Sequence, residues 1–349
     1  MPQPLITHQP LALLVTGGAG FIGSNFIHHW LERYPEDSII NLDALTYAGN
    51  KESLSDFEGN NHYRFVQGNI TDRELVLDLT KQVDMVVHFA AESHVDRSIL
   101  DPSIFVKTNV LGTQTLLDAA VSCGITRFHH ISTDEVFGTL PLDSTTQFSE
   151  ETPYDPRSPY SASKAGSDFL VRAYGETYGL PYSITNCSNN YGPYMFPEKL
   201  IPLAITNLLE NKPVPVYGNG QQVRDWLFVR DHCYAIELVL LAGKSGMTYL
   251  VGGLKKDMTN LSVIQKIVEL MHAPEEAITF VTDRPGHDER YSVNWSKIHT
   301  ELGWEPSVTF EEGLQTTVTW YQNNEAWWKP LKARGKDFFE KHYSLAKED

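Results

Sequence analysis

The amino-acid sequence predicts an α/β fold, a doubly wound parallel sheet with a smaller C-terminal α/β lobe. Over the first 190 residues, short apolar runs alternate with stretches of helical periodicity, which is the pattern of repeated βαβ units. The first apolar run leads directly into a glycine-rich turn. After residue 190 the elements become shorter, and aromatic and turn-forming residues become more frequent.

The individual elements follow from these runs in order. Apolar runs predict strands at residues 11–15, 38–42, 63–67, 85–89, 128–132 and 182–186. Helical periodicity predicts helices at residues 21–32, 102–123 and 160–178. We therefore divide the chain into residues 1–190 and 191–349, and we expect part of 226–255 to rejoin the first unit.

Composition excludes several classes of protein. The chain has 349 residues, of which 41% are apolar and 21% charged, as in ordinary globular proteins. Its net charge of −16 argues against nucleic acid or an anionic membrane surface as a partner. No run is long and apolar enough to span a bilayer, and the first ten residues lack the features of a signal peptide. We expect a cytoplasmic protein.

Cysteine and histidine give no indication of a metal. Cys123, Cys187 and Cys233 are scattered and lack metal-ligand spacing, so we expect reduced thiols. The histidines near the motifs described below also lack acidic or cysteine companions at ligand spacing. The sequence therefore predicts no metal site.

The turn after the first predicted strand carries a dinucleotide fingerprint. Its glycines permit a tight turn, close approach of the backbone to a pyrophosphate and close helix packing. The helix that follows would present its N-terminus to the pyrophosphate. The candidate contacts are Gly17, Gly20, Phe21, Ile22 and Gly23. A glycine-rich surface turn is the alternative, and the flanking strand and helix argue against it.

A carboxylate at the end of the second strand selects the cofactor. Asp43 lies 20 residues after Gly23, where it can accept bonds from the ribose hydroxyls and would repel a 2′-phosphate. This favours NAD over NADP and makes residues 1–190 an NAD-binding Rossmann domain. The pairs Asn69-Ile70 and Ala90-Ala91 follow two further strands and are expected to line the adenine and ribose side.

A tyrosine and a lysine form the first catalytic pair. Tyr160 and Lys164 are spaced i,i+4 and so lie on one face of the predicted helix. A nearby ammonium would stabilise a phenolate and lower the pKa of the tyrosine, as a base near neutral pH requires. Tyr47 and Lys51 have the same spacing but fall in a predicted loop.

The strand at 128–132 leads into the second catalytic group. Thr133 could bind a reacting sugar hydroxyl while Tyr160 removes its proton and hydride leaves for NAD. Glu135 could then abstract the acidified neighbouring proton, and a protonated Asp134 could assist departure of a hydroxyl. A solvated turn is the alternative for this acidic pair, and its place at the carboxyl end of a central strand disfavours it.

The chain resembles the dTDP-glucose 4,6-dehydratase family, within the nucleotide-sugar branch of the extended short-chain dehydrogenase/reductases. The resemblance runs over nearly the whole length. It rests on Thr16-Gly-Gly-Ala-Gly-Phe-Ile-Gly23, Leu45-Thr-Tyr-Ala-Gly-Asn50, Ala90-Ala-Glu-Ser-His-Val-Asp-Arg-Ser98, Ser132-Thr-Asp-Glu-Val-Phe-Gly138, Tyr160-Ser-Ala-Ser-Lys164, Asn189-Asn-Tyr-Gly-Pro-Tyr194 and Phe196-Pro-Glu-Lys-Leu-Ile-Pro202. The glycine motif marks only the superfamily, whereas Thr-Asp-Glu with Phe-Pro-Glu-Lys-Leu-Ile-Pro is more specific.

The resemblance implies a lyase that converts dTDP-glucose to dTDP-4-keto-6-deoxyglucose and water with recycled NAD. It implies Asp134 as proton donor, Glu135 as base at C5 and Tyr160 as base at O4, supported by Lys164. Further implied contacts to the cofactor are Thr46, Ser93, Thr108 and Asn189, of which Ser93, Asn189 and also Thr133 would contact the substrate. Asn69 stands where many relatives have aspartate, and asparagine can still accept a bond from adenine.

A diphosphate on an acidic protein needs local cations. Arg224 and Arg290 are the candidates for bidentate contact, and Pro215 to Tyr217 would offer an apolar wall for a pyrimidine. The resemblance supports both arginines and adds neighbours around the nucleotide. The predicted substrate contacts of this lobe are Glu198, Lys199, Leu200, Pro215, Tyr217, Arg224, Asn260, Asp288, Arg290 and Tyr291. Surface ion pairs or core aromatic packing are the alternatives for each of them.

Other functions remain open at this stage. A UDP-glucose 4,6-dehydratase or another nucleotide-sugar dehydratase or epimerase would share most of these motifs, although an epimerase has no use for an acid and a base aimed at C5 and C6. A non-catalytic dinucleotide sensor could keep the glycine turn without the catalytic groups. The resemblance also implies a homodimer formed through the helices near 102–123 and 160–178.

Overall fold

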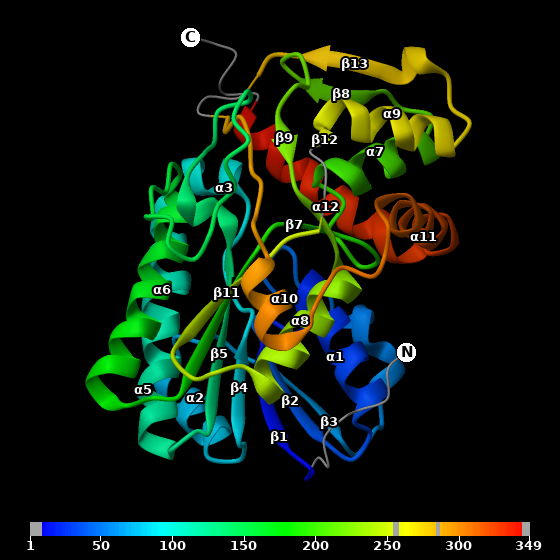
Figure 1. The fold of residues 1–349 in the computed structure, drawn as a ribbon. Coiled ribbons are helices and arrows are strands. Elements are labelled where there is room, and N and C mark those ends of the chain that lie inside the picture. The colour runs from blue at the N-terminus through cyan, green and yellow to red at the C-terminus, as the bar shows by residue number, and fades with distance from the viewer. Residues whose placement is uncertain (1–8, 254–257, 284–286, 344–349) are drawn as a thin grey trace.

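A parallel sheet forms the centre of the protein (Figure 1). The structure is a computed structural model that describes residues 9–253, 258–283 and 287–343, with side chains as far as residue 335. Within this part of the chain the sheet has seven strands in the order β11-β6-β5-β4-β1-β2-β3. They are β1 (Ala12–Thr16), β2 (Ser38–Asp43), β3 (Tyr63–Gln67), β4 (Met85–His88), β5 (Arg127–Thr133), β6 (Tyr182–Cys187) and β11 (Met247–Val251).

The predicted fold class is confirmed. Each of the six predicted strands forms with its ends within about one residue of the predicted ones. All neighbouring pairs run parallel, as expected for strands joined by helical crossovers. Because the strands are parallel, the residues that follow them gather at one edge of the sheet.

Helices cover both faces of this sheet. On one face pack α1 (Phe21–Arg33) and α8 (Val229–Ala242), and on the other α2 (Arg73–Thr80), α5 (Thr113–Cys123) and α6 (Pro159–Tyr178) (Figure 1). Their apolar stripes bury residues such as Trp30 and Leu116 completely. Burial of this kind stabilises the fold by about 25 cal/mol for each Å² of apolar surface removed from water.

The predicted helix at 102–123 is interrupted in its geometry. It consists of α4 (Pro102–Phe105), the π-helical segment η2 (Val106–Gly112) and α5. Asp101 caps its start by accepting from the backbone N–H of Ser103. Hydrophobic periodicity does not distinguish a π turn from an α turn, so the π-helical segment could not be predicted from it. Before this segment lie η1 (Lys51–Phe57) and α3 (Val95–Leu100).

The C-terminal part builds a separate apolar core, which includes Trp226, Phe228 and Trp328. It lies above the sheet in Figure 1. The short helix η3 (Asp134–Phe137) directly follows β5. The remaining elements, in chain order, are β7 (Asn189–Tyr191), α7 (Leu200–Leu209), β8 (Val214–Tyr217), β9 (Val223–Arg224), β10 (Trp226–Phe228), β12 (Met258–Thr259), α9 (Asn260–Leu270), η4 (Glu275–Ala277), β13 (Ile278–Val281), α10 (Ser296–Leu302), α11 (Phe310–Asn323) and α12 (Glu325–Tyr343).

Strands from before and after residue 190 pair with one another. β6 pairs with β11, and β7 pairs with β10. The division into 1–190 and 191–349 stays a prediction. Across the residues described, no helix has the length and apolar character needed to cross a membrane.

Candidate active site

The glycine turn after β1 packs directly against the residue that follows β4. Gly17 has φ +72°, and a Cβ at this position would lie 2.6 Å from the backbone of Ala90. Only glycine fits such an approach without displacing the backbone. Helix α1 begins at Phe21 without a side-chain cap, so its first amides remain available to an anion. These features fit the pyrophosphate of a dinucleotide.

Asp43 ties the end of β2 to the glycine turn. Its Oδ2 accepts from the backbone N–H of Ala19 at 2.9 Å, and its Oδ1 accepts from that of Leu45 at 2.7 Å. Burial raises the pKa of Asp43, and these two hydrogen bonds act in the opposite direction. Each carboxylate oxygen keeps a second lone pair, so the group can still accept bonds from ribose hydroxyls.

The other predicted cofactor residues differ in exposure. Ile70 is buried, whereas Thr46 and Asn69 are exposed and Thr108 is half-buried within η2. The side-chain oxygen of Asn69 accepts from the backbone N–H and the hydroxyl of Thr71, so part of its capacity is used in a turn. Ser93 Oγ lies 3.2 Å from the hydroxyl of Tyr47.

Helix α6 presents the predicted tyrosine and lysine. A capping box at Ser158 fixes its start, which places Tyr160 in the first turn and Lys164 one turn later. Lys164 is 4% exposed, and its Nζ donates to the carbonyl of Ile131 at 2.7 Å. The lysine is therefore fixed against β5, which also carries the second catalytic group at its end.

The predicted lowering of the pKa of Tyr160 is wrong for the protein's own groups. Burial raises the pKa of this phenol well above its usual value, and the nearby charge of Glu135 raises it further. The sequence placed the ammonium of Lys164 correctly on the same helix, but it did not show how deeply the phenol is buried. A positive charge close to the phenol would oppose these effects.

Thr133, Asp134 and Glu135 form the turn that ends β5. Thr133 Oγ1 accepts from the backbone N–H of Glu135 at 3.3 Å and lies 3.4 Å from Asp134 Oδ1, to which it donates. Asp134 is 1% exposed. Burial, then the charges of Glu135 and Asp225, raises its pKa well above the usual value. These surroundings favour the protonated form of Asp134, which is the form that a proton donor needs.

A cavity of about 830 Å³ begins at the catalytic groups and extends into the C-terminal part. This volume lies within the range of pockets for small ligands. Predicted residues that line it are Glu135, Tyr160, Asn189, Glu198, Lys199, Leu200, Pro215, Tyr217, Arg224, Asn260 and Tyr291. Predicted substrate or catalytic residues outside this lining are Ser93, Thr133, Asp134, Lys164, Asp288 and Arg290.

The two predicted arginines occupy different positions. Arg224 lines the cavity, stacks over the ring of Tyr291 at 4.3 Å, and donates through Nη2 to the carbonyl of Asp288 at 3.0 Å. Arg290 is 3% exposed and donates through Nη1 to the carbonyl of Thr146 at 2.8 Å. The structure thus brings Arg224 to the cavity, whereas Arg290 is not among the residues that line it.

Several lining residues were not predicted, among them His94, Asp96 and Phe196. His94 adopts φ +91°, an uncommon backbone conformation for a non-glycine residue. Its Nε2 lies 3.9 Å from Glu198 Oε1 and its Nδ1 lies 4.0 Å from Asp96 Oδ2. All three stand inside or beside the quoted motifs, which were the available signal. Lys329 and Lys332 of α12 also line the cavity, and no motif marked them.

Comparisons with known proteins show which proteins this chain resembles. The profile of the family described as GDP-mannose 4,6 dehydratase matches residues 14–317. A dTDP-glucose 4,6-dehydratase of Mycobacterium tuberculosis is 52% identical over 323 residues, covering 92% of this chain and 96% of that protein. Among solved structures, the dTDP-glucose 4,6-dehydratase DesIV of Streptomyces venezuelae, solved with NAD bound, has a TM-score of 0.89 at 50% identity, covering 92% of this chain and 100% of that one.

A more distant structure has the same fold. A UDP-glucose 4-epimerase of Thermotoga maritima has a TM-score of 0.84 at 27% identity, covering 90% of this chain and 100% of that one. The fold alone therefore does not separate dehydration from epimerisation, and the side chains at the end of β5 must be considered.

Proposed function

The chain belongs to the family described as GDP-mannose 4,6 dehydratase, and we propose that its reaction is the 4,6-dehydration of dTDP-glucose. The enzyme is an NAD-dependent lyase that yields dTDP-4-keto-6-deoxyglucose and water. The observation that carries this proposal is that Glu135 and Tyr160 line the same cavity, while Asp134 is buried directly beside Glu135 with its pKa raised.

The first step is oxidation at C4. The glycine turn and Asp43 would hold NAD, which would supply a hydride acceptor for C4 and, once reduced, a hydride donor for C6. Tyr160 takes the proton of the C4 hydroxyl, and Thr133 binds the same hydroxyl. Lys164, one turn along α6, supplies positive charge beneath the tyrosine. The remaining cofactor contacts are assigned as the sequence predicts, at the carboxyl edge of the sheet.

The second step is loss of water across C5 and C6. The new ketone acidifies the proton on C5, which Glu135 removes. Asp134 gives its proton to the C6 hydroxyl, which leaves as water. When the hydride returns to C6, Glu135 returns its proton to C5. The proton that Tyr160 removes from the C4 hydroxyl balances the one that Asp134 gives, so the net change is the loss of one water.

We assign different ends of the cavity to the sugar and to the nucleotide of the substrate. Glu135 and Tyr160 hold the hexose end, and Arg224 with Lys199 faces the diphosphate. Pro215 and Tyr217 line the part assigned to the pyrimidine.

We assign the cofactor to the unit 1–190, rejoined by part of 226–255, and the nucleotide sugar mainly to 191–349. Arg290 supports this lobe through its bond to Thr146 and remains a proposed contact, as does Asp288.

A turnover assay tests the function. Purified protein incubated with dTDP-glucose should give a 4-keto product that absorbs in alkali, whereas formation of dTDP-galactose would refute dehydration in favour of epimerisation. Parallel assays with UDP-glucose measure the preference for thymidine. NAD that remains bound with no turnover of any nucleotide sugar would favour a sensor instead.

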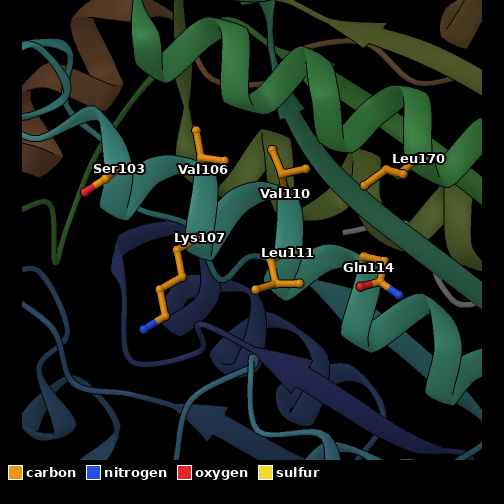
Figure 2. A pocket seen from close by; sticks show the side chains of 7 residues that line it. All are labelled: Ser103, Val106, Lys107, Val110, Leu111, Gln114 and Leu170. Carbon is orange, nitrogen blue, oxygen red and sulfur yellow. The ribbon is translucent and has the colours of Figure 1, made fainter.

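An exposed apolar groove supports a homodimer. Val106, Val110 and Leu111 of the η2 segment face Leu170 of α6 in this groove (Figure 2). Val106 is 55% exposed and Leu111 47% exposed, which is unusual for adjacent apolar side chains unless another surface covers them. We assign this surface to a second copy of the chain, through the helices near 102–123 and 160–178.

A reducing compartment also fits the protein. Cys123, Cys187 and Cys233 are free thiols, and an oxidising environment would favour pairing or modification of exposed thiols. We therefore assign the enzyme to the cytoplasm.

A further inference from the structure

A buried chain of polar side chains lies behind Lys164. Its Nζ is 3.4 Å from His130 Nε2, and the same imidazole nitrogen is 3.2 Å from Asp168 Oδ1. Asp168 lies one turn after Lys164 on α6, and it is completely buried, as is His130. The three groups thus connect α6 to β5 in the interior, and the reaction as derived above uses only the lysine.

Lys164 needs an anion in this position. An ammonium removed from water is strongly destabilising unless a counter-charge compensates it. Burial lowers the pKa of Lys164 to about 8, and the charge of Asp168 acts against this effect. His130 cannot compensate it, because burial and then the charge of Lys164 lower the pKa of the imidazole to about 4, which leaves the ring neutral near pH 7.

Asp168 supplies the negative charge. Burial raises the pKa of this carboxyl, but contacts with His130 and the charge of Lys164 outweigh that effect, so the pKa lies below its usual value. The other described groups around Lys164 are neutral near pH 7, because burial raises the pKa of the Cys187 thiol to about 12 and lowers that of His88 well below its usual value. The titratable groups that interact with Lys164 are His88 from β4, His130 from β5, Asp168 from α6 and Cys187 from β6, and Tyr160 precedes Lys164 by one turn on α6.

The second oxygen of Asp168 braces the end of β5. Its Oδ2 accepts from Ser132 Oγ at 2.8 Å and from the hydroxyl of Tyr154 at 2.8 Å. Asn186 Nδ2 also lies 3.3 Å from this oxygen and donates to the carbonyl of Thr133 at 3.0 Å. The carboxylate of Asp168 therefore contacts both His130, which lies beside Lys164, and Ser132, which precedes the catalytic turn.

We propose that Asp168 is a positioning residue, whose negative charge holds Lys164 as an ammonium ion one turn after Tyr160 on α6. The part of this proposal that concerns catalysis rests on the proposed function, in which Tyr160 is the base. Asp168 does not touch the substrate or the cofactor, and its effect on the reaction passes through Lys164.

The variant Asp168→Asn tests this role, with Tyr154→Phe as its matched control. The control removes a hydrogen bond to the same carboxylate but keeps its charge. In Asp168→Asn the ammonium loses its counter-charge, so Lys164 should lose its proton at lower pH. We expect kcat to fall by about tenfold near pH 8 and the alkaline limb of the kcat profile to move down by about one pH unit. KM for dTDP-glucose should change by less than about twofold.

The controls decide between positioning and a purely structural role. Tyr154→Phe should keep the alkaline limb of the wild-type enzyme, and formation of enzyme-bound NADH in a single turnover should be slowed only in Asp168→Asn. An unchanged alkaline limb in Asp168→Asn would overturn the proposal. An equal displacement in Tyr154→Phe would overturn it as well.

A stability cycle keeps the proposal testable if Asp168→Asn folds poorly. The double variant Lys164→Met with Asp168→Asn removes both charges, so it should recover most of the urea resistance that Asp168→Asn loses. If the double variant is no more stable than Asp168→Asn, the carboxylate is needed for its hydrogen bonds and not as a counter-ion, which refutes the proposal. This cycle needs no substrate, so a wild-type protein without turnover would refute the proposed function and leave the charge coupling measurable.

Discussion

Two carboxyl groups that are adjacent in the chain have opposite surroundings. Asp134 is almost completely buried, which raises its pKa, whereas Glu135 is half-buried and lines the cavity. The change from β5 to the short helix η3 turns successive side chains in different directions. An acid and a base can therefore act on neighbouring atoms of one substrate.

Replacing the base should stop the reaction after oxidation. In Glu135→Gln, Tyr160 can still remove the C4 proton, but no carboxylate takes the proton from C5. We expect overall turnover to fall by about 10²–10⁴-fold and bound NADH to accumulate, which its absorbance and fluorescence would report. Glu151→Gln changes an exposed glutamate nearby and should behave as wild type. Full turnover by Glu135→Gln would remove Glu135 from its role.

Replacing the phenol should block the reaction earlier. Tyr160→Phe leaves no group to accept the C4 hydroxyl proton, so formation of bound NADH in a single turnover should slow by about 10²-fold or more. Tyr178→Phe, on the exposed end of the same helix, is the control. NADH formation at the wild-type rate in Tyr160→Phe would contradict the assignment.

The burial of Asp134 should make stability depend on pH. Its pKa is raised in the folded state, so its contribution is complete below the pKa of the unfolded chain and is lost as pH rises through the folded pKa. Asparagine resembles the protonated acid. The free energy of unfolding of Asp134→Asn relative to wild type should therefore increase with pH, by up to about 1.4 kcal/mol per pH unit. Urea unfolding at several pH values measures this, with exposed Asp143→Asn as a control that should show no such trend.

A motif can predict both the type and the position of a site residue, as the glycine turn, Tyr160 with Lys164, and the Thr-Asp-Glu turn illustrate. The structure brings Glu135 and Tyr160 of these motifs to one cavity. Arg224 and Arg290 are both predicted as cations for a diphosphate, but which of them lines the cavity depends on tertiary contacts that the sequence does not show. Asp168 was not selected, although its i+4 spacing from Lys164 was visible, because periodicity does not show that both side chains face the interior.

At the scale of elements, the site is assembled mainly at the edge of the sheet where the carboxyl ends of the parallel strands meet. Parallel strands place the turns after β1, β2, β4 and β5 on one side, and each turn carries a different group for the cofactor or the reaction. The sequence predicted these strands from apolar runs alone. It could not predict the π-helical segment η2, because such a segment keeps the same apolar composition and differs only in which carbonyl each amide contacts.

Two glycine variants separate the effect of close packing at Gly17 from the effect of a positive φ alone. Gly17 and Gly124 both adopt positive φ, but only at Gly17 would a Cβ meet backbone, whereas nothing lies within 4 Å at Gly124. Both alanine variants should lose about 1 kcal/mol of unfolding free energy from the backbone. Gly17→Ala should in addition weaken NAD binding by about tenfold or more, because the turn must move away from Ala90. Calorimetric titration with NAD measures this affinity. Equal NAD affinity in the two variants would contradict the assignment of the glycine turn to the cofactor.

At the scale of the whole molecule, the strand order explains why the chain cannot be divided by a single cut. β11 comes from residues well beyond the boundary predicted near 190 and completes the sheet beside β6. Apolar patterns predict that a strand exists, but they carry little information on which neighbour it selects. The acidic net charge, by contrast, follows directly from the composition, and it makes Arg224 and the lysines that line the cavity the important cations for a diphosphate.

The apolar groove between η2 and α6 (Figure 2) should decide the oligomeric state. Aspartate at Val106 and Leu111 would place two charges in the proposed contact between copies, where unpaired charges are strongly unfavourable. We expect the wild-type protein to sediment as a dimer and the variant Val106→Asp with Leu111→Asp as a monomer with an unchanged circular dichroism spectrum. Phe280→Asp is the matched control, because Phe280 is 57% exposed, much as Val106 is, but belongs to β13 in the C-terminal part.

A dimer that persists in the double variant, or a monomeric wild type, would exclude this surface as the interface. Because α6 also carries Tyr160 and Lys164, a monomeric variant with reduced turnover would further indicate that pairing steadies the catalytic helix.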